Sequence, residues 1–169
     1  MSEPLLHLVL FHPEIPPNTG NVGRLAVGYD LVLHLVHPLG FDIDEKAVRR
    51  AGLDYWKSVR LVEHEDGEAF LRWAAGRRVH AFTTRAQRPF TAAEWAPGDV
   101  LLFGPESVGL PAAVVTSVVG AGGHAWRIPM WGPIRSLNLA NAVSIATVHA
   151  LTTLAPQAFA DPGEDGCAR

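Results

Sequence analysis

Residues 12–24 carry the first side chains that could bind a ligand. Two prolines stiffen the approach to an expected helix, and Asn18 or Thr19 could cap its first turn, so that free backbone N–H groups face an anion. Asn21 and Arg24 are three residues apart and share a helix face. These types suit a phosphate or a sugar hydroxyl, but by themselves they fit an ordinary capped helix with a surface arginine better.

Residues 101–111 place Glu106 between two glycines, directly after an apolar run. Glycines permit turns and a close approach of a ligand to the backbone that other residues resist. A nucleophile elbow around Ser107 is excluded because Pro105 stands where that motif needs glycine. A phosphate-binding P-loop is excluded because no Gly-Lys-Ser/Thr follows. The segment is therefore either a ligand-binding loop or a structural turn with a solvated glutamate.

Residues 128–142 form the third segment, in which a Pro/Gly loop precedes the last expected helix. Ser136 is expected to cap this helix, and Asn138 and Asn141 are expected inside it. Asparagine is a poor residue for a helix interior, so two of them on a small, apolar helix indicate specific hydrogen bonds. Their partner is either a ligand or nearby backbone in a tight core.

Apolar runs alternate with helical patterns along the chain, which predicts an α/β domain with a mostly parallel sheet flanked by helices. The expected strands are residues 5–11, 31–36, 59–62, 79–83, 99–103 and 125–128. The expected helices are residues 18–28, 44–51, 66–75, 111–119 and 137–154, and residues 85–97 are expected to be a solvated, turn-rich connection. Ligand sites in such sheets lie at the carboxyl ends of the strands, where all three segments begin.

The composition fits one folded domain, with 169 residues, a net charge of −3 and 48% hydrophobic residues. A single cysteine, Cys167, excludes an internal disulfide and favours a reducing, cytoplasmic location. The N-terminus lacks the basic region of a signal peptide, and no apolar run approaches the roughly 18 residues that a membrane span needs. We expect one domain over residues 1–156 and a disordered polar tail over residues 157–169.

The histidines and tryptophans give weaker signals. No HExxH pattern or cysteine partner accompanies His34 and His37, so no metal site is predicted. The five tryptophans could stack on bases, although core or surface anchors are the commoner use. The absence of GxGxxG argues against a dinucleotide site.

Together the three segments resemble the SPOUT superfamily of RNA methyltransferases, in its TrmH-like branch. Within that branch the chain looks most like the small, single-domain enzymes that methylate the wobble nucleotide of tRNA. The resemblance covers about residues 6–154 and rests on PEIPPNTGNVGR (13–24), FGPESVGLP (103–111) and IPM…RSLNLANAVSIA (128–146), with HPLGF (37–41) and RRAGLDYW (49–56) in support. Phe82 departs from a usual leucine and Asp30 from a common glycine, while Trp131 and Ile134 lie in the variable part of the third motif.

The resemblance implies a deep trefoil knot at the C-terminal end of the fold, an obligate homodimer, and S-adenosylmethionine held by the loops of the knot. Matching motif positions carry the cofactor contacts over to Phe82, Gly104, Ile128 and Ser136. Further candidates from the same motifs are Thr83, Met130 and Leu137. The pocket is expected to be mostly apolar, with backbone hydrogen bonds to the adenine.

The implied reaction is attack by the ribose 2′-oxygen of the wobble nucleotide, a cytidine or modified uridine at position 34 of tRNA, on the methyl group of S-adenosylmethionine. Arg24 would stabilise the developing alkoxide, because a guanidinium keeps its proton. Asn18 and Asn138 would orient Arg24 and the ribose. Glu106 would order its loop or hold Arg24 by a charge-assisted bond, and Ser136 would cap the last helix and touch the cofactor.

The anticodon stem-loop of tRNA is the expected RNA partner, with no metal and no membrane. The candidate phosphate contacts are Arg49, Arg50, Arg85, Arg88 and Arg135, each of which also fits a solvated surface charge. Three alternatives stay open: a 2′-O-methyltransferase for another RNA or tRNA position, a catalytically silent RNA-binding protein of the same fold, and a generic anion-binding or hydrolytic α/β protein.

Overall fold

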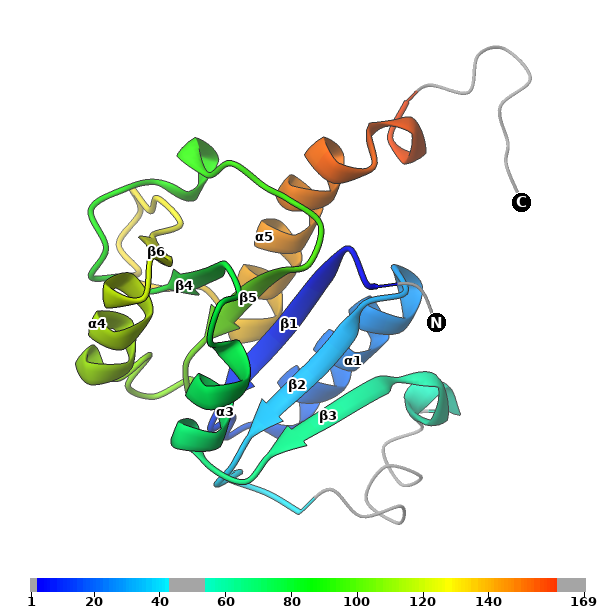
Figure 1. Ribbon diagram of the computed structural model, residues 1–169, viewed down its shortest axis with the longest axis horizontal. Helices are drawn as coiled ribbons and strands as arrows, with labels where there is room; N and C mark the ends of the chain where they lie inside the picture. The colour runs from blue at the N-terminus through cyan, green and yellow to red at the C-terminus, as the bar shows by residue number, and fades with distance from the viewer. Residues whose placement is uncertain (1–2, 43–53, 161–169) are drawn as a thin grey trace.

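One six-stranded parallel sheet organises the protein in a computed structural model that describes residues 3–42 and 54–160 (Figure 1). The strand order is β3-β2-β1-β5-β4-β6, and every neighbouring pair is parallel. The strands are β1 (Leu6–Phe11), β2 (Val32–Val36), β3 (Arg60–His64), β4 (Val79–Phe82), β5 (Asp99–Phe103) and β6 (His124–Trp126). The helices are α1 (Pro16–Gly28), α3 (Gly67–Ala74), α4 (Ala112–Gly120) and α5 (Leu139–Leu154), with short 3-10 helices η1 (Asp54–Ser58), η2 (Phe90–Ala92) and η3 (Pro156–Ala158).

The strands β1, β2, β4 and β5 are buried on both faces, because helices cover each face of the sheet there. In β1 the leucines at positions 6, 8 and 10 face a core shared with α1 and α5, while Val9 and Phe11 face a second core shared with α3 and α4. Successive side chains of a strand point to opposite faces, so a central strand between two helical layers must be apolar on both. This is why β1, β2 and β5 read as almost continuous apolar runs.

Every strand and helix expected within the described residues is present, and its ends shift by at most two residues. The expected helix 44–51 lies outside the described residues. Residues 85–97 are not simply a solvated connection, because Phe90 and Trp95 are buried in the first core. The tail that we expected over residues 157–169 is ordered at its start, because residues 156–158 form η3. None of the helices within 3–42 and 54–160 has the length and apolar character that crossing a membrane requires.

A buried ionic network fixes the β4–β5–β6 side of the sheet. The Asp99 carboxylate accepts two hydrogen bonds from Arg78, at 2.8 and 2.7 Å, and lies 3.1 Å from Nε2 of His80. The indole of Trp126 donates to Nδ1 of His80 at 2.8 Å, so His80 must carry its proton on Nε2 and donate it to Asp99. Burial acts to raise the pKa of Asp99, but the hydrogen bonds from His80 and Arg78 outweigh it and hold the pKa at about 2.

Three buried histidines form a hydrogen-bonded row on the α3 face of the sheet. Nδ1 of His7 lies 2.9 Å from Nε2 of His34, whose Nδ1 lies 3.0 Å from Nε2 of His64. The Trp73 ring of α3 packs on all three imidazoles. Burial lowers the pKa of His7 to about 4 and that of His34 to about 3, with nearby cationic side chains adding to the effect. The row is therefore neutral at physiological pH and serves the core.

This row predicts that the protein loses stability in mild acid. In the unfolded chain His7 and His34 take up protons near pH 6.5, but the folded chain resists protonation until about pH 4 and pH 3. The stabilisation is complete above pH 6.5 and is lost as the pH falls toward these folded values. We expect the unfolding free energy from urea titrations to decline below pH 6.5 by up to ~1.4 kcal/mol per pH unit for each such histidine. A constant free energy between pH 7.5 and 4.5 would show that the row is not neutral in the folded state.

Candidate functional site

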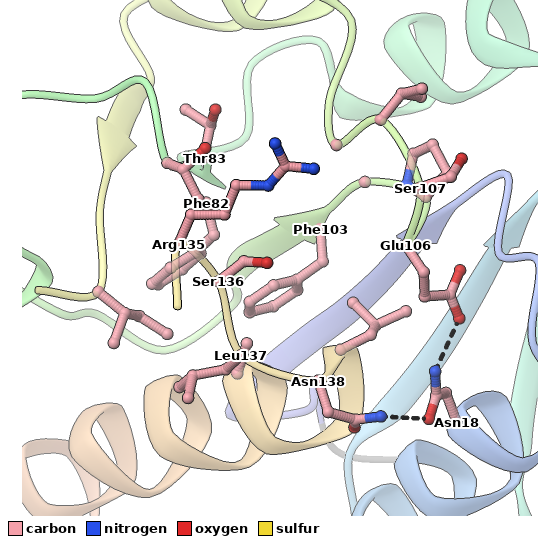
Figure 2. A pocket seen from close by; sticks show the side chains of 18 of the residues that line it. Asn18, Phe82, Thr83, Phe103, Glu106, Ser107, Arg135, Ser136, Leu137 and Asn138 are labelled. Carbon is pink, nitrogen blue, oxygen red and sulfur yellow. Dashed lines mark hydrogen bonds between the residues drawn. The ribbon is translucent and has the colours of Figure 1, made fainter. Parts of the chain in front are cut away.

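A cavity of about 630 Å³ opens at the carboxyl edge of the sheet, where the loops after β1, β4, β5 and β6 meet (Figure 2). This edge includes the boundary between β1 and β5, where the strand order reverses direction. Open α/β sheets bind their ligands at such a point. The size lies within the usual range of small-molecule and cofactor pockets.

The cavity gathers most of the residues that the sequence singled out. All seven predicted cofactor contacts line it, namely Phe82, Thr83, Gly104, Ile128, Met130, Ser136 and Leu137. Four of the five predicted catalytic residues also line it: Asn18, Glu106, Asn138 and Ser136, the last of which is a predicted cofactor contact as well. The three motif segments, far apart in the chain, therefore form one site.

A hydrogen-bonded relay joins the three segments across the mouth of the cavity (Figure 2). Nδ2 of Asn18 donates to Oε1 of Glu106 at 3.0 Å, and Oδ1 of Asn18 accepts from Nδ2 of Asn138 at 2.9 Å. Oδ1 of Asn138 in turn accepts from the backbone N–H groups of Ala140 and Asn141, at the start of α5. The carboxylate can only accept and the backbone N–H groups can only donate, so both amide orientations are determined by their neighbours.

Two predicted helix caps are corrected by this relay. Asn18 is not an N-cap: α1 begins two residues earlier, after Ile15, and Asn18 is 5% exposed within its first turn. Asn138, not Ser136, caps α5, and Ser136 lies exposed in the loop before it. The Ser-Leu-Asn sequence offers two good capping residues, and the partner of Asn138 on α1 selects between them.

Glu106 supplies the cap that α1 lacks from its own side chains. The N-cap residue Ile15 makes no side-chain cap, but Oε2 and Oε1 of Glu106 accept from the backbone N–H groups of Glu14 and Ile15, at 2.8 and 3.3 Å. An acceptor with negative charge stabilises a helix N-terminus. The prediction that Glu106 orders its loop fits these contacts, but among the described residues its bonds go to α1 and not to Arg24.

Glu14 completes a reciprocal clasp between the first two loops. Its carboxylate accepts from the backbone N–H and the hydroxyl of Ser107, at 2.8 and 2.7 Å. These bonds from Ser107 lower the pKa of Glu14, as expected for an anion that accepts two hydrogen bonds. Glu14 therefore anchors the two loops to each other.

Gly104 is required by the close approach of two backbone segments. A Cβ atom at this position would lie against the backbone nitrogen of Leu110 and 2.8 Å from its Cα. Such contacts force the backbone to move. The glycine therefore keeps the loop after β5 folded tightly beside the cavity.

The inner wall of the cavity is aromatic and aliphatic. Phe82, at the end of β4, stacks on Phe103, at the end of β5, with ring centroids 4.7 Å apart and an interplanar angle of 12°. Ile128 and Leu137 line the same cavity from the loop after β6. An apolar wall beside backbone loops suits a flat heteroaromatic ring.

Arg24 is the predicted catalytic residue that the structure does not bring to the cavity. It lies exposed on α1, and its guanidinium carbon is 5.6 Å from the ring centroid of Tyr55. The Tyr55 hydroxyl donates to the carbonyl oxygen of Gly20 at 2.8 Å and so ties η1 to α1 beneath the arginine. Within one chain, Arg24 and the cavity are therefore separate features.

The predicted RNA contacts fall into three groups. Arg85 and Arg135 line the cavity, whereas Arg88 stacks over Trp126, 4.6 Å from its ring centroid. Arg49 and Arg50 lie outside the described residues. Sequence reasoning missed Arg127, which follows β6 and was hidden by its position between two motifs.

No group of three or more His, Cys, Asp or Glu side chains within residues 3–42 and 54–160 is arranged to hold a metal ion. Among the described residues of the cavity, the Ser107 hydroxyl donates to the Glu14 carboxylate, which also accepts the backbone N–H of Ser107, and the Glu106 carboxylate accepts from loop backbone. Both carboxylates are used to hold the loops together. The arrangement can bind a flat, amphipathic ligand and present it at a cationic rim. It offers positioning and electrostatics rather than covalent chemistry.

Several known proteins are similar to this chain in sequence or in fold. A curated relative from Aeromonas hydrophila, named tRNA (cytidine(34)-2′-O)-methyltransferase, is 48% identical over 141 residues, covering 83% of this chain and 89% of the relative. A solved structure described as "Structural insights into the 2-OH methylation of C/U34 on tRNA" has a TM-score of 0.79 at 47% identity, covering 89% of this chain and 97% of the other. An AdoMet-bound rRNA methyltransferase from Sinorhizobium meliloti has a TM-score of 0.77 at 29% identity, covering 90% of this chain and 58% of the other.

The family comparison spans nearly all the elements that build the cavity. The SpoU rRNA methylase family matches residues 5–148, from the start of the first strand into α5. The matched residues therefore include those that form the relay, the clasp and the apolar wall. This chain belongs to the SpoU methylase family.

Proposed function

We propose that this protein transfers a methyl group from S-adenosylmethionine to the ribose 2′-oxygen of nucleotide 34 of tRNA. The observation that carries the proposal is the single cavity built by the three motif segments, in a chain whose relatives at 41–48% identity carry that activity in their names. Because the methyl donor and the acceptor oxygen must meet, the tRNA is received at the face that holds the cofactor.

The cavity fits S-adenosylmethionine by size and by the character of its walls. Phe82, Ile128 and Leu137 provide an apolar slot for adenine, and the tight loop at Gly104 exposes backbone groups beside it. Arg85 lies at the same cavity and suits the carboxylate of the methionine moiety. When bound, the cofactor supplies an electrophilic methyl group on a positively charged sulfur.

The protein's task is to position the ribose and to stabilise the oxygen as its proton leaves. In the reaction the C–S bond to the methyl group breaks, an O–CH₃ bond forms, and the hydroxyl proton is released, leaving S-adenosylhomocysteine. Arg24 stabilises the developing negative charge through N–H donors, because a guanidinium does not give up its proton to act as a base. Asn18, Asn138 and Glu106 act indirectly, by holding the loops that shape the cavity.

A second copy of the chain supplies Arg24 in this proposal. The arginine is exposed on α1 and absent from the cavity lining of its own chain, so it reaches a reacting ribose from a neighbouring protomer. The homodimer is then part of the active site and not only a means of stability.

The remaining structural expectations belong to the same proposal. The loops after β4, β5 and β6 converge on the N-terminus of α5, which agrees with a C-terminal trefoil knot threaded by that helix. We also propose a single domain over residues 1–156. A cytoplasmic location is part of the same proposal, because the proposed substrate is tRNA.

Removal of the 2′-hydroxyl from nucleotide 34 tests which atom of the tRNA accepts the methyl group. We expect labelled S-adenosylmethionine to modify nucleotide 34 in tRNA isolated from cells lacking this protein, as mapped by mass spectrometry after nuclease digestion. A semisynthetic copy with 2′-deoxyribose at position 34 should accept no label, while a 2′-deoxy substitution at position 36 should leave transfer intact. Label in the 34-deoxy RNA, or in another nucleotide of the natural tRNA, would contradict the proposal.

Mixed dimers test whether Arg24 acts across the interface. Arg24→Ala alone should lose transfer with unchanged cofactor affinity, and Gly104→Ala alone should lose transfer because the loop beside the cavity is displaced. When the two variants are refolded together in equal amounts, half of the dimers contain one chain of each kind. In each mixed dimer one site combines the intact cavity of one chain with the intact Arg24 of the other, so about a quarter of wild-type activity should return. Zero activity in the mixture, with mixed dimers demonstrated by differential tags and folding checked by circular dichroism, would place Arg24 in its own chain's site.

A further inference from the structure

The cationic side chains of this acidic protein are unevenly distributed. The net charge is −3, yet the loops after β4 and β6, residues 83–98 and 127–138, hold four arginines and one acidic residue. They are Arg85, Arg88, Arg127 and Arg135, against Glu94. The loops after β4 and β6 thus carry local positive charge, which attracts phosphates.

A second cavity of about 330 Å³ lies in these loops, next to the first. It shares Thr84, Ile128, Met130 and Arg135 with the cofactor cavity, and Arg127 and Ile134 line it from the loop after β6. Its volume is about half that of the first cavity and suits one nucleotide rather than another whole cofactor. A ligand in it would lie beside a ligand in the first cavity, because the two cavities share these residues.

An exposed indole stands on the rim of the second cavity. The side chain of Trp131, between Met130 and Gly132 of the lining, is 94% exposed, and that of Ile134 is 61% exposed. Pro129 and Pro133 flank this stretch and restrict its backbone, so the indole is presented on a stiffened loop. Tryptophan exposed to this degree beside arginines is the arrangement that single-stranded nucleic acid favours, because bases stack on the ring while cations hold the backbone.

We infer that the loop from Arg127 to Arg135 is a nucleotide subsite of the RNA substrate. In this inference, which rests on the proposed function, Trp131 stacks on a base next to the methylated nucleotide, and Arg127 and Arg135 hold its phosphates. Charge complementarity and the wall shared with the cofactor cavity favour RNA as the occupant over a second copy of the chain. The subsite positions the neighbouring base and leaves the cofactor contacts unchanged.

Truncation of the indole tests the stacking contact. Trp131→Ala should raise the KM for tRNA about 5- to 100-fold, the range expected for loss of one base–aromatic stack. The Kd for S-adenosylmethionine and the molar mass from light scattering should match the wild type. Trp131→Phe should restore the KM to within about threefold, and Phe159→Ala, which removes an exposed aromatic ring remote from both cavities, should change nothing.

Two results would overturn the inference while leaving the proposed function intact. If Trp131→Ala methylates tRNA with a wild-type KM, the indole does not contact RNA. If the variant instead has half the molar mass, the loop is covered by a second copy. Failure of the wild-type protein to methylate any tRNA would reject the proposed function itself, and this control is run first.

Fluorescence and salt dependence provide readouts that a structural role of the loop would not produce. Binding of tRNA should quench wild-type tryptophan emission more than that of Trp131→Phe, since the other tryptophans are more buried. Arg127→Ala should reduce the slope of log Kd against log salt by about 1, the effect of one lost phosphate contact. Arg72→Ala, at an exposed arginine of α3, should leave the slope unchanged. Equal quenching and equal slopes would reject the subsite.

Discussion

The amide of Asn18 is the interaction on which the site depends, because it is the point where three distant loops meet. Its nitrogen donates to Glu106 and its oxygen accepts from Asn138, so one buried side chain joins the loops after β1, β5 and β6. The helix α1 gains its cap from Glu106, and α5 gains its cap from Asn138. Because Asn18 is buried, the loss of Glu106 or Asn138 would leave part of its amide without a hydrogen-bond partner.

The relay is one of several contacts that hold the loops around the cavity in place. The Glu14–Ser107 clasp and the close backbone packing at Gly104 fix the second loop, while the Phe82–Phe103 stack provides an apolar floor from two adjacent strands. Trp131 and Arg127 take no part in these contacts, so a substitution at either position leaves them in place.

The sequence predicted the layers well and the contacts between loops poorly. Apolar runs such as Leu6–Phe11 identified the strands, because a strand that is buried on both faces is apolar at almost every position. The cap of α5 was assigned to Ser136 because propensity cannot choose between two good capping residues two positions apart, and Glu106 gave no hint of its partner 88 residues earlier. The residues that the resemblance assigned to the cofactor line one cavity, whereas Arg24 lies outside it, and its proposed role requires a second copy of the chain.

A double-mutant cycle between Asn18 and Glu106 tests this account most directly. Asn18→Ala, Glu106→Ala and the double variant are unfolded in urea, with Asn18→Ala and Glu68→Ala as the control pair, because Glu68 lies on α3 on the opposite face of the sheet. The account predicts a coupling free energy of about 1 kcal/mol or more for the first pair and additivity for the control. Additivity within about 0.3 kcal/mol for Asn18 and Glu106 would show that the loops are held independently and would contradict the relay as the organising interaction.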